Sequence, residues 1–327
     1  MERRAFVALS VGGLLAVPFI SGAQPPGKVY RVGAVSAGTS WVEGSQFLEA
    51  LRQGLRSVGY IEGKNLVLER RNAEGRYERL PELIRDLIRL KVDLIYGLGP
   101  PGVQAALHAG TTIPLVVVDL ESDPIERGFV ASLSRPGGHI TGLFLDMPEI
   151  TGKWLELLRG AAPKISRVAV LWDATTGTAQ VKATEVAAQA LALQVQTFAV
   201  EGHATFGDVL DAVHGARFGG LVVLSSPFLL QQRQRLAHFA RENRLPAISM
   251  FREFAEEGGL MAYGPNYVDM TRRGALAIDR ILKGAKPGDV PIERPERFDF
   301  VINLKTAKAL GLTISPSLLQ RADQVIE

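Results

Sequence analysis

The chain has 327 residues, 46% of them hydrophobic, which is enough for about two globular domains. Its 37 basic and 34 acidic residues are interspersed and leave a formal charge of +3, so the sequence lacks the dense basic tracts that bind nucleic acid. It contains no cysteine, which excludes disulfides, and its five histidines lack the spacing of metal ligands. We therefore expect neither a metal nor a nucleic-acid partner.

The N-terminal residues have the composition of an export signal. Arg3 and Arg4 precede an apolar stretch over 5–20, and small residues at 21–23 fit the site that a signal peptidase cuts. This stretch is shorter than the roughly 20 residues that cross a bilayer. We predict that residues 1–23 are a signal peptide, cleaved after Ala23, and that the mature protein is periplasmic. The arginine pair also fits a twin-arginine signal.

After residue 28, short apolar runs typical of strands alternate with helical periodicity. In the first half the runs predict strands at 29–35, 65–73, 92–98 and 114–120. Between them, apolar residues recur at helical spacing, as over 47–58 and 80–88. Strands and helices that alternate in this way indicate parallel strands joined by right-handed crossovers.

The segment SRPGGHITG at 134–142 interrupts this alternation. Further strands are predicted beyond it at 167–173, 195–200, 220–226, 246–250, 259–264 and 298–304. We therefore predict an α/β fold of two similar lobes, each a parallel sheet flanked by helices. His139 has no nearby base or nucleophile, so we interpret it as a residue that tunes the joint between the lobes or the adjacent cleft, and not as a catalytic group.

Two other strings suggest chemistry at first sight. Gly97, Gly99 and Gly102 have the spacing of a dinucleotide-binding loop, but Pro100 and Pro101 lack the amide hydrogens that would hold a pyrophosphate. AVSAG at 34–38 is like a nucleophile elbow, yet no His and acid follow in the order that such hydrolases use. We therefore expect no cofactor and no enzyme activity, and we interpret both strings as loops at the ligand-binding edge of a sheet.

Several segments together resemble the ABC transporter substrate-binding proteins of the tryptophan/tyrosine uptake type. The segments include GYIEGKN, SLSRPGGHITG, GGLMAYGPN and the tail that begins FDFVINL. The resemblance covers essentially the whole mature chain and implies a two-lobed type I periplasmic binding protein fold with three interlobe crossings. It also implies a monomer that binds a small organic ligand, with an aromatic amino acid as a candidate, for an ABC permease and its ATPase. The alternative is a protein whose closed form signals to a sensor kinase or chemoreceptor.

The resemblance further implies domain boundaries and ligand contacts. Lobe one would comprise 29–145 and 266–290, and lobe two 146–263 and 297–327. The residues expected to face the ligand are Ser36, Thr39, Ser40, Gly99, Pro101, Asp123, Gly142, Asp173, Ser226, Phe228 and Tyr263.

The chemistry of these side chains indicates how they would hold an amino acid. Hydroxyls of Ser36 and Thr39, with helix N-terminal amides, would meet a carboxylate, while Asp123 or Asp173 would pair with an ammonium group. Two positions depart from the family pattern and leave the ligand's identity open. Residue 139 is His where the family usually has Asn, and residue 122 is Ser where it often has Gly.

Overall fold

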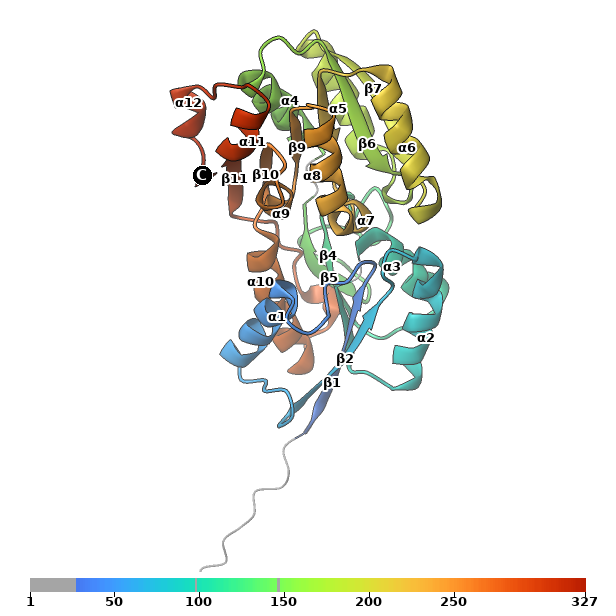
Figure 1. Cartoon of the computed structure of the whole chain (residues 1–327). Coiled ribbons are helices and arrows are strands. Elements are labelled where there is room, and N and C mark those ends of the chain that lie inside the picture. The colour runs from blue at the N-terminus through green and yellow to red at the C-terminus, as the bar shows by residue number, and fades with distance from the viewer. Residues whose placement is uncertain (1–27, 98, 146–147) are drawn as a thin grey trace, which may run out of the picture.

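The computed structural model describes residues 28–97, 99–145 and 148–327, which form two α/β lobes stacked end to end (Figure 1). The signal peptide predicted for residues 1–23 lies outside the described residues. In the described ranges, none of the helices combines the length and the apolar content that crossing a bilayer requires.

The first lobe is built on a parallel sheet that has, within the described residues, five strands in the order β2-β1-β3-β4-β5. The strands are β1 (Tyr30–Ser36), β2 (Leu66–Asn72), β3 (Leu94–Gly97), β4 (Leu115–Asp119) and β5 (Ile140–Phe144). The connecting segments contain α1 (Gln46–Ser57), the 3-10 turn η1 (Tyr77–Arg79), α2 (Leu80–Arg89) and α3 (Gly99–His108). Strands β3, β4 and β5 are buried throughout, because helices cover both faces of a parallel sheet.

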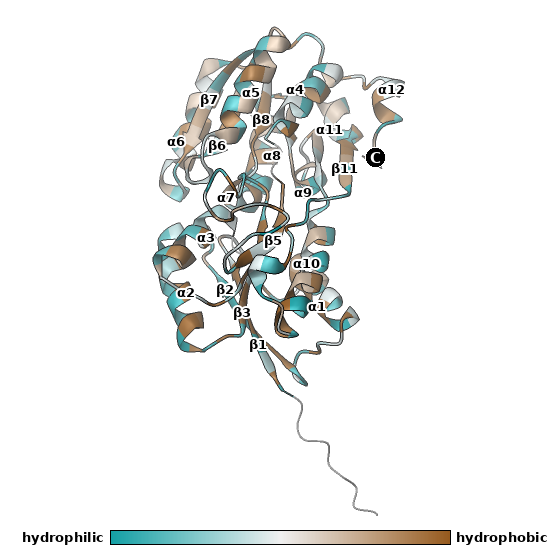
Figure 2. Ribbon diagram, turned by 180° about the vertical axis from the view of Figure 1, so that it is seen from behind, coloured by the Kyte–Doolittle hydropathy of each residue, from teal (hydrophilic) through white to brown (hydrophobic). Residues whose placement is uncertain are grey.

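The second lobe contains the order β12-β11-β10-β9-β8-β6-β7, seven strands within the described residues. They are β6 (Arg167–Asp173), β7 (Gln194–Val200), β8 (Gly220–Val223), β9 (Ala247–Ser249), β10 (Met261–Pro265), β11 (Phe298–Asn303) and β12 (Gln324–Ile326). Its helices are α4 (Ile150–Ala161), η2 (Ala174–Thr176), α5 (Ala179–Ala190), α6 (His203–Ala216), α7 (Pro227–Gln231), α8 (Arg233–Glu242), α9 (Arg252–Glu256), α11 (Leu304–Ala309) and α12 (Pro316–Leu319). Figure 2 shows strongly hydrophobic strands inside each lobe and hydrophilic residues on the outer helices.

The chain passes between the lobes three times, as predicted. Strand β5 leads towards α4, β10 leads into α10 (Tyr267–Leu282), and the chain returns through η3 (Pro287–Asp289) to β11. Helix α10 packs against α1 and the first sheet, where Gly274 lies directly on the ring of Tyr96. The Tyr96 hydroxyl donates to the carbonyl of Thr271 (3.0 Å) and holds the helix there. This placement of α10 supports the predicted domain boundaries, which remain a proposal.

The second sheet differs from the prediction in one strand direction. Strand β11 runs antiparallel to β10, with Met261 opposite Ile302. The chain leaves the second lobe at the end of β10 and re-enters it from the first lobe, so the returning strand must run the other way. The short strands β5 and β12 were not predicted, because each has only a few residues and adjoins turn-forming sequence.

The segment 134–142 packs against the return path of the chain. The amide of Gly137 donates to the carbonyl of Gly288 (3.1 Å), and the hydroxyl of Thr141 donates to that of Val290 (2.7 Å). The carbonyl of His139 accepts from the first residue of β4, which places His139 at the amino ends of these strands. Ligands of α/β sheets bind at the carboxyl ends. His139 therefore lies at the edge of the first sheet opposite the one that faces the second lobe, so the prediction that it tunes the joint between the lobes or the adjacent cleft is wrong.

Candidate ligand-binding cavity between the lobes

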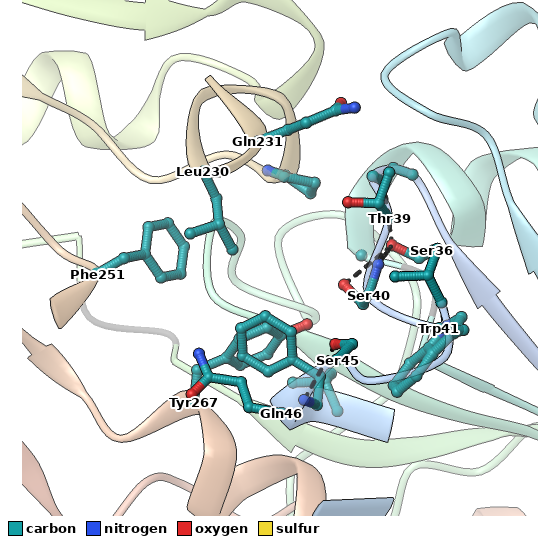
Figure 3. Close-up of a pocket in the computed structure, with 18 of the residues that line it drawn as sticks. Ser36, Thr39, Ser40, Trp41, Ser45, Gln46, Leu230, Gln231, Phe251 and Tyr267 are labelled. Carbon is teal, nitrogen blue, oxygen red and sulfur yellow. Dashed lines mark hydrogen bonds between the residues drawn. The ribbon is translucent and has the colours of Figure 1, made fainter. Parts of the chain in front are cut away.

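A cavity of about 480 Å³ lies between the two lobes. The first lobe contributes the loop after β1 and residues at the carboxyl ends of β3 and β4, and the second contributes α7, the start of α8 and the segment around α9. Figure 3 shows side chains from both lobes and from the start of α10 directed toward the same space. The volume is in the range of sites for small organic molecules.

The loop after β1 is held in shape by its own serines. The hydroxyl oxygen of Ser36 accepts hydrogen bonds from the amides of Gly38 (3.0 Å) and Ser40 (3.4 Å). The same hydroxyl donates a hydrogen bond to the Ser40 hydroxyl oxygen (3.1 Å). Ser45 caps α1 by accepting from the amide of Phe47 (3.2 Å). One wall of the cavity is therefore lined by serine and threonine hydroxyl groups and by the N-terminal end of the 12-residue helix α1. This arrangement favours binding of an anionic ligand group.

Aromatic side chains form the apolar part of the wall. The ring of Tyr267 packs against both Phe47 and Phe251, with its centroid 5.0 Å from that of Phe47 and 6.1 Å from that of Phe251. Trp41 is 3% exposed, and its ring packs 5.6 Å from that of Tyr96 beneath the sheet edge. Because these rings are already packed against one another, they offer a preformed surface to a flat apolar group.

Two buried carboxyl groups line the same cavity. Burial and the charge of Asp119 raise the pKa of Glu121 to about 8. Glu121 accepts hydrogen bonds from the hydroxyl of Ser225 (2.6 Å) and from the amide of Leu120 (3.2 Å). Burial also raises the pKa of Glu253. A cationic ligand group placed here would stabilise the charged form of both carboxyls.

A guanidinium group faces the same cavity from α8. Arg233 is a lining residue, and one of its Nη atoms donates to the carbonyl of Leu230 (3.3 Å). Its buried Nε has no hydrogen-bond partner within the described ranges. A buried donor without a partner is costly, so an anionic ligand group that reached this atom would stabilise it.

Four of the residues predicted from the sequence line the cavity, namely Ser36, Thr39, Ser40 and Gly99. They belong to the loops after β1 and β3, which the parallel topology brings to one edge of the sheet. Ligand contact by any predicted residue remains a prediction.

The three other predicted residues of the first lobe lie elsewhere. Asp123 lines a separate cavity of about 240 Å³ and accepts from the amide of Ile125 (2.7 Å) in its own turn. Gly142 has a φ of 141°, and a Cβ there would be 2.0 Å from the carbonyl oxygen of Val117, so this position is a close approach between strands. Pro101 lies in the first turn of α3 and is not a lining residue.

The predicted residues of the second lobe lie behind the cavity wall. Asp173 is fully buried and accepts from the hydroxyl of Ser226 (2.8 Å). Phe228 is fully buried, in an edge-to-face contact with Phe206 in the core of the lobe. The ring of Tyr263 on β10 stacks on that of Phe298 on β11, with centroids 6.0 Å apart, so it packs between the two strands through which the chain leaves and re-enters the second lobe.

Prediction from the sequence did not select the lining residues Glu121, Arg233, Glu253 and Tyr267. Glu121 follows β4 by two residues, and this position at the end of a strand was a usable signal. Glu253 and Tyr267 lie in the first turns of α9 and α10. These helix ends line the cavity only because the two lobes pack together, so no local sequence pattern predicts that either residue lines it.

The chain also matches known proteins. The sequence model of the family described as "ABC transporter substrate binding protein" matches residues 42–326. The chain belongs to this family. This substrate-binding protein is 27% identical over 263 residues to a curated protein of Clostridioides difficile (strain R20291) named "Tyrosine-binding protein". The alignment covers 80% of this chain and 75% of that relative.

Solved structures show the same fold. A conserved domain protein from Vibrio cholerae and an ABC domain in complex with L-Trp from Streptococcus pneumonia each have a TM-score of 0.82 and 23% identity. Each alignment covers 91% of this chain and 100% of the other. A ligand-free, open substrate-binding protein from Clostridium difficile has a TM-score of 0.61 and 24% identity, over 91% of this chain and 99% of the other. The predicted type I periplasmic binding protein fold is therefore confirmed.

Membership of the family defines the general role of the substrate-binding protein. Such proteins bind a small molecule outside the cytoplasmic membrane and deliver it to a permease, and both the family and the curated relative are binding proteins. The predictions of a small-molecule ligand and a permease partner are thereby confirmed.

Proposed function

We propose that this substrate-binding protein binds an aromatic amino acid, tryptophan or tyrosine, between its lobes and delivers it to the permease and ATPase of an importer. The observation that carries the proposal is a single cavity that joins an aromatic wall to buried groups of both charge signs. The curated relative named for tyrosine binding and the solved structure with L-Trp support the same ligand class.

The aromatic wall would hold the ligand's ring. Phe251 from the second lobe and Tyr267 from the start of α10 meet on one side of the cavity, and Trp41 lies on the side of the first lobe (Figure 3). A ring enclosed by these side chains would lose contact with water, and aromatic contacts add about 0.5–1.5 kcal/mol per pair beyond simple burial.

The charged groups would hold the two ends of the amino acid. An ammonium group would pair with Glu253 and Glu121. Burial raises the pKa of both carboxyls, so their ionised forms are poorly stabilised until a cation lies beside them. The carboxylate would meet the free Nε of Arg233 and the hydroxyls of Ser36 and Thr39. These roles replace those first assigned to Asp123 and Asp173, which do not line the cavity.

A binding assay with chemically matched ligands tests the proposal. L-tryptophan, tryptamine and indole-3-propionate share the indole ring, but tryptamine lacks the carboxylate and indole-3-propionate lacks the ammonium group. Isothermal titration calorimetry should show that each analogue binds at least about tenfold more weakly than L-tryptophan, since each loses a charge-assisted contact. If neither L-tryptophan nor L-tyrosine binds, the proposed ligand class is wrong.

Export and oligomeric state complete the proposal. We infer that residues 1–23 are removed and that the protein acts as a monomer in the periplasm. Intact mass measured on the periplasmic fraction should correspond to a chain starting at Gln24, and multi-angle light scattering should give one chain per particle. Expression in a strain without twin-arginine translocation separates the two export routes. Membership of a transporter family favours delivery to a permease over the signalling alternative.

A further inference from the structure

Tyr77 connects the two lobes at a point behind the ligand cavity. It begins η1 in the first lobe, and its half-buried ring packs against the hydrophobic cores of both lobes. On the first-lobe side the neighbouring core contains Leu80, and on the second-lobe side it contains Phe206 and Phe228. A side chain shared in this way makes its full set of contacts only when the lobes are together.

The Tyr77 hydroxyl donates a hydrogen bond to the buried carboxyl group of Asp173 in the opposite lobe. It donates a hydrogen bond of 2.7 Å to Oδ2 of Asp173, which also accepts from the Ser226 hydroxyl (2.8 Å). The other carboxylate oxygen accepts from the amide (3.0 Å) and the hydroxyl (2.7 Å) of Thr175. Ser226 and Thr175 belong to the second lobe, so Tyr77 is the donor that depends on closure. A buried carboxylate gains from each such donor.

This contact is separate from the ligand site. Tyr77 and Asp173 are both absent from the set of described residues that line the 480 Å³ cavity. The adjacent loop adds a second contact of the same kind, since the carbonyl of Glu74 lies 3.4 Å from a ring nitrogen of His203 in the second lobe. None of the residues in these two lobe-to-lobe contacts lines that cavity, so neither contact includes a group that a ligand would occupy.

We infer that Tyr77 and Asp173 form a ligand-independent latch, which keeps part of the ligand-free population closed and so raises the affinity for every ligand by a common factor. The apparent affinity of a protein scales with the fraction that is in the binding-competent state. Tyr77 is therefore a positioning residue that acts through the closure equilibrium, without touching the ligand.

The variant Tyr77→Phe tests the latch because it keeps the ring and removes only the hydroxyl. Small-angle X-ray scattering of the ligand-free protein should show a larger radius of gyration for the variant than for the wild type. Titrations with L-tryptophan and L-tyrosine should show both affinities reduced by a similar factor, roughly tenfold, with their ratio unchanged. Tyr30→Phe is the matched control, because Tyr30 begins β1 and contacts Tyr60 in its own lobe.

The two measurements separate this inference from the proposed function. An unchanged radius of gyration in ligand-free Tyr77→Phe overturns the latch, whatever the affinities do, and so does a changed ratio between the two ligands. If neither amino acid binds the wild type, the ligand class is wrong, and the scattering comparison alone decides on the latch. A loss of thermal stability without a change in shape counts against the latch, since it assigns Tyr77 a purely structural role.

Discussion

Gln46 at the start of α1 donates a hydrogen bond of 2.6 Å to Oε1 of Glu253 on α9, and thereby joins the two lobes across the ligand cavity. Both residues line the cavity, unlike the pair formed by Tyr77 and Asp173. The bond aligns one oxygen of a buried carboxyl with the first lobe. A ligand group that paired with this carboxyl would therefore bind beside a contact between the two lobes.

Glu253→Gln should weaken L-tryptophan binding by roughly 10- to 150-fold, because a hydrogen bond to a charged group contributes about 1.5–3 kcal/mol. The substitution keeps the size of the side chain but removes its charge. Calorimetry with L-tryptophan measures the loss. Glu256→Gln is the control, since Glu256 pairs with Arg252 on the same short helix outside the cavity. Equal affinities for wild type and Glu253→Gln would contradict the assigned role.

Phe251→Leu should weaken L-tryptophan binding by about 2- to 10-fold, since it removes one aromatic contact while keeping an apolar side chain. Binding of L-leucine, measured in the same competition assay, should change little. Phe239→Leu serves as the control, because Phe239 is a partly buried residue that packs against the core of the second lobe and does not line the cavity. A parallel loss for both ligands would show that the ring acts by shaping the cavity and not by contacting an aromatic ligand.

Stability should fall as the pH rises through the range set by Glu121. Burial and the charge of Asp119 raise the pKa of this carboxyl from 4.5 to about 8 in the folded protein. The folded state then holds more protons than the unfolded state between these values, so the free energy of unfolding decreases as pH increases. Thermal melts from pH 5 to 8 should show this decrease in the ligand-free wild type.

The variant Glu121→Gln should show a flatter pH dependence over the same interval, since it cannot titrate. Glu126→Gln, at an exposed position, should behave like the wild type. Identical slopes for wild type and Glu121→Gln would mean that this carboxyl does not titrate in the window.

Gly142→Ala should destabilise the protein by about 3 kcal/mol or more, because the new Cβ would lie 2.0 Å from the carbonyl oxygen of Val117 and the backbone φ is 141°. Gly138→Ala, in the same segment, should be close to neutral, since a Cβ there meets no atom within 4 Å and its φ is negative or extended. Chemical denaturation measures both. Similar midpoints for the two variants would contradict the structural role of Gly142.

Local patterns were sufficient for most of the secondary structure and for the loops that face the cleft. Alternating apolar runs such as those of β3 and β4 predict parallel strands, and parallel strands end at one edge of a sheet. Ser36 at the end of β1 and Gly99 after β3 could therefore be placed at the ligand-binding edge of the sheet from their positions alone. The antiparallel direction of β11 could not be predicted in this way, because it depends on the path of the chain through the other lobe.

The sequence by itself determined the two-lobed α/β class through its periodicity, the family through its motifs, and the sheet edge that lines the cavity through the positions of the strand ends, all of which are local properties. Only the tertiary structure decided that Phe228 belongs to a core, that Gly142 is a strand contact and that Glu253 and Tyr267 face the cavity. The physical reason is that the site forms between two bodies. Which side chains reach it depends on how the lobes close, as in the contact of Gln46 with Glu253, which are 207 positions apart in the chain.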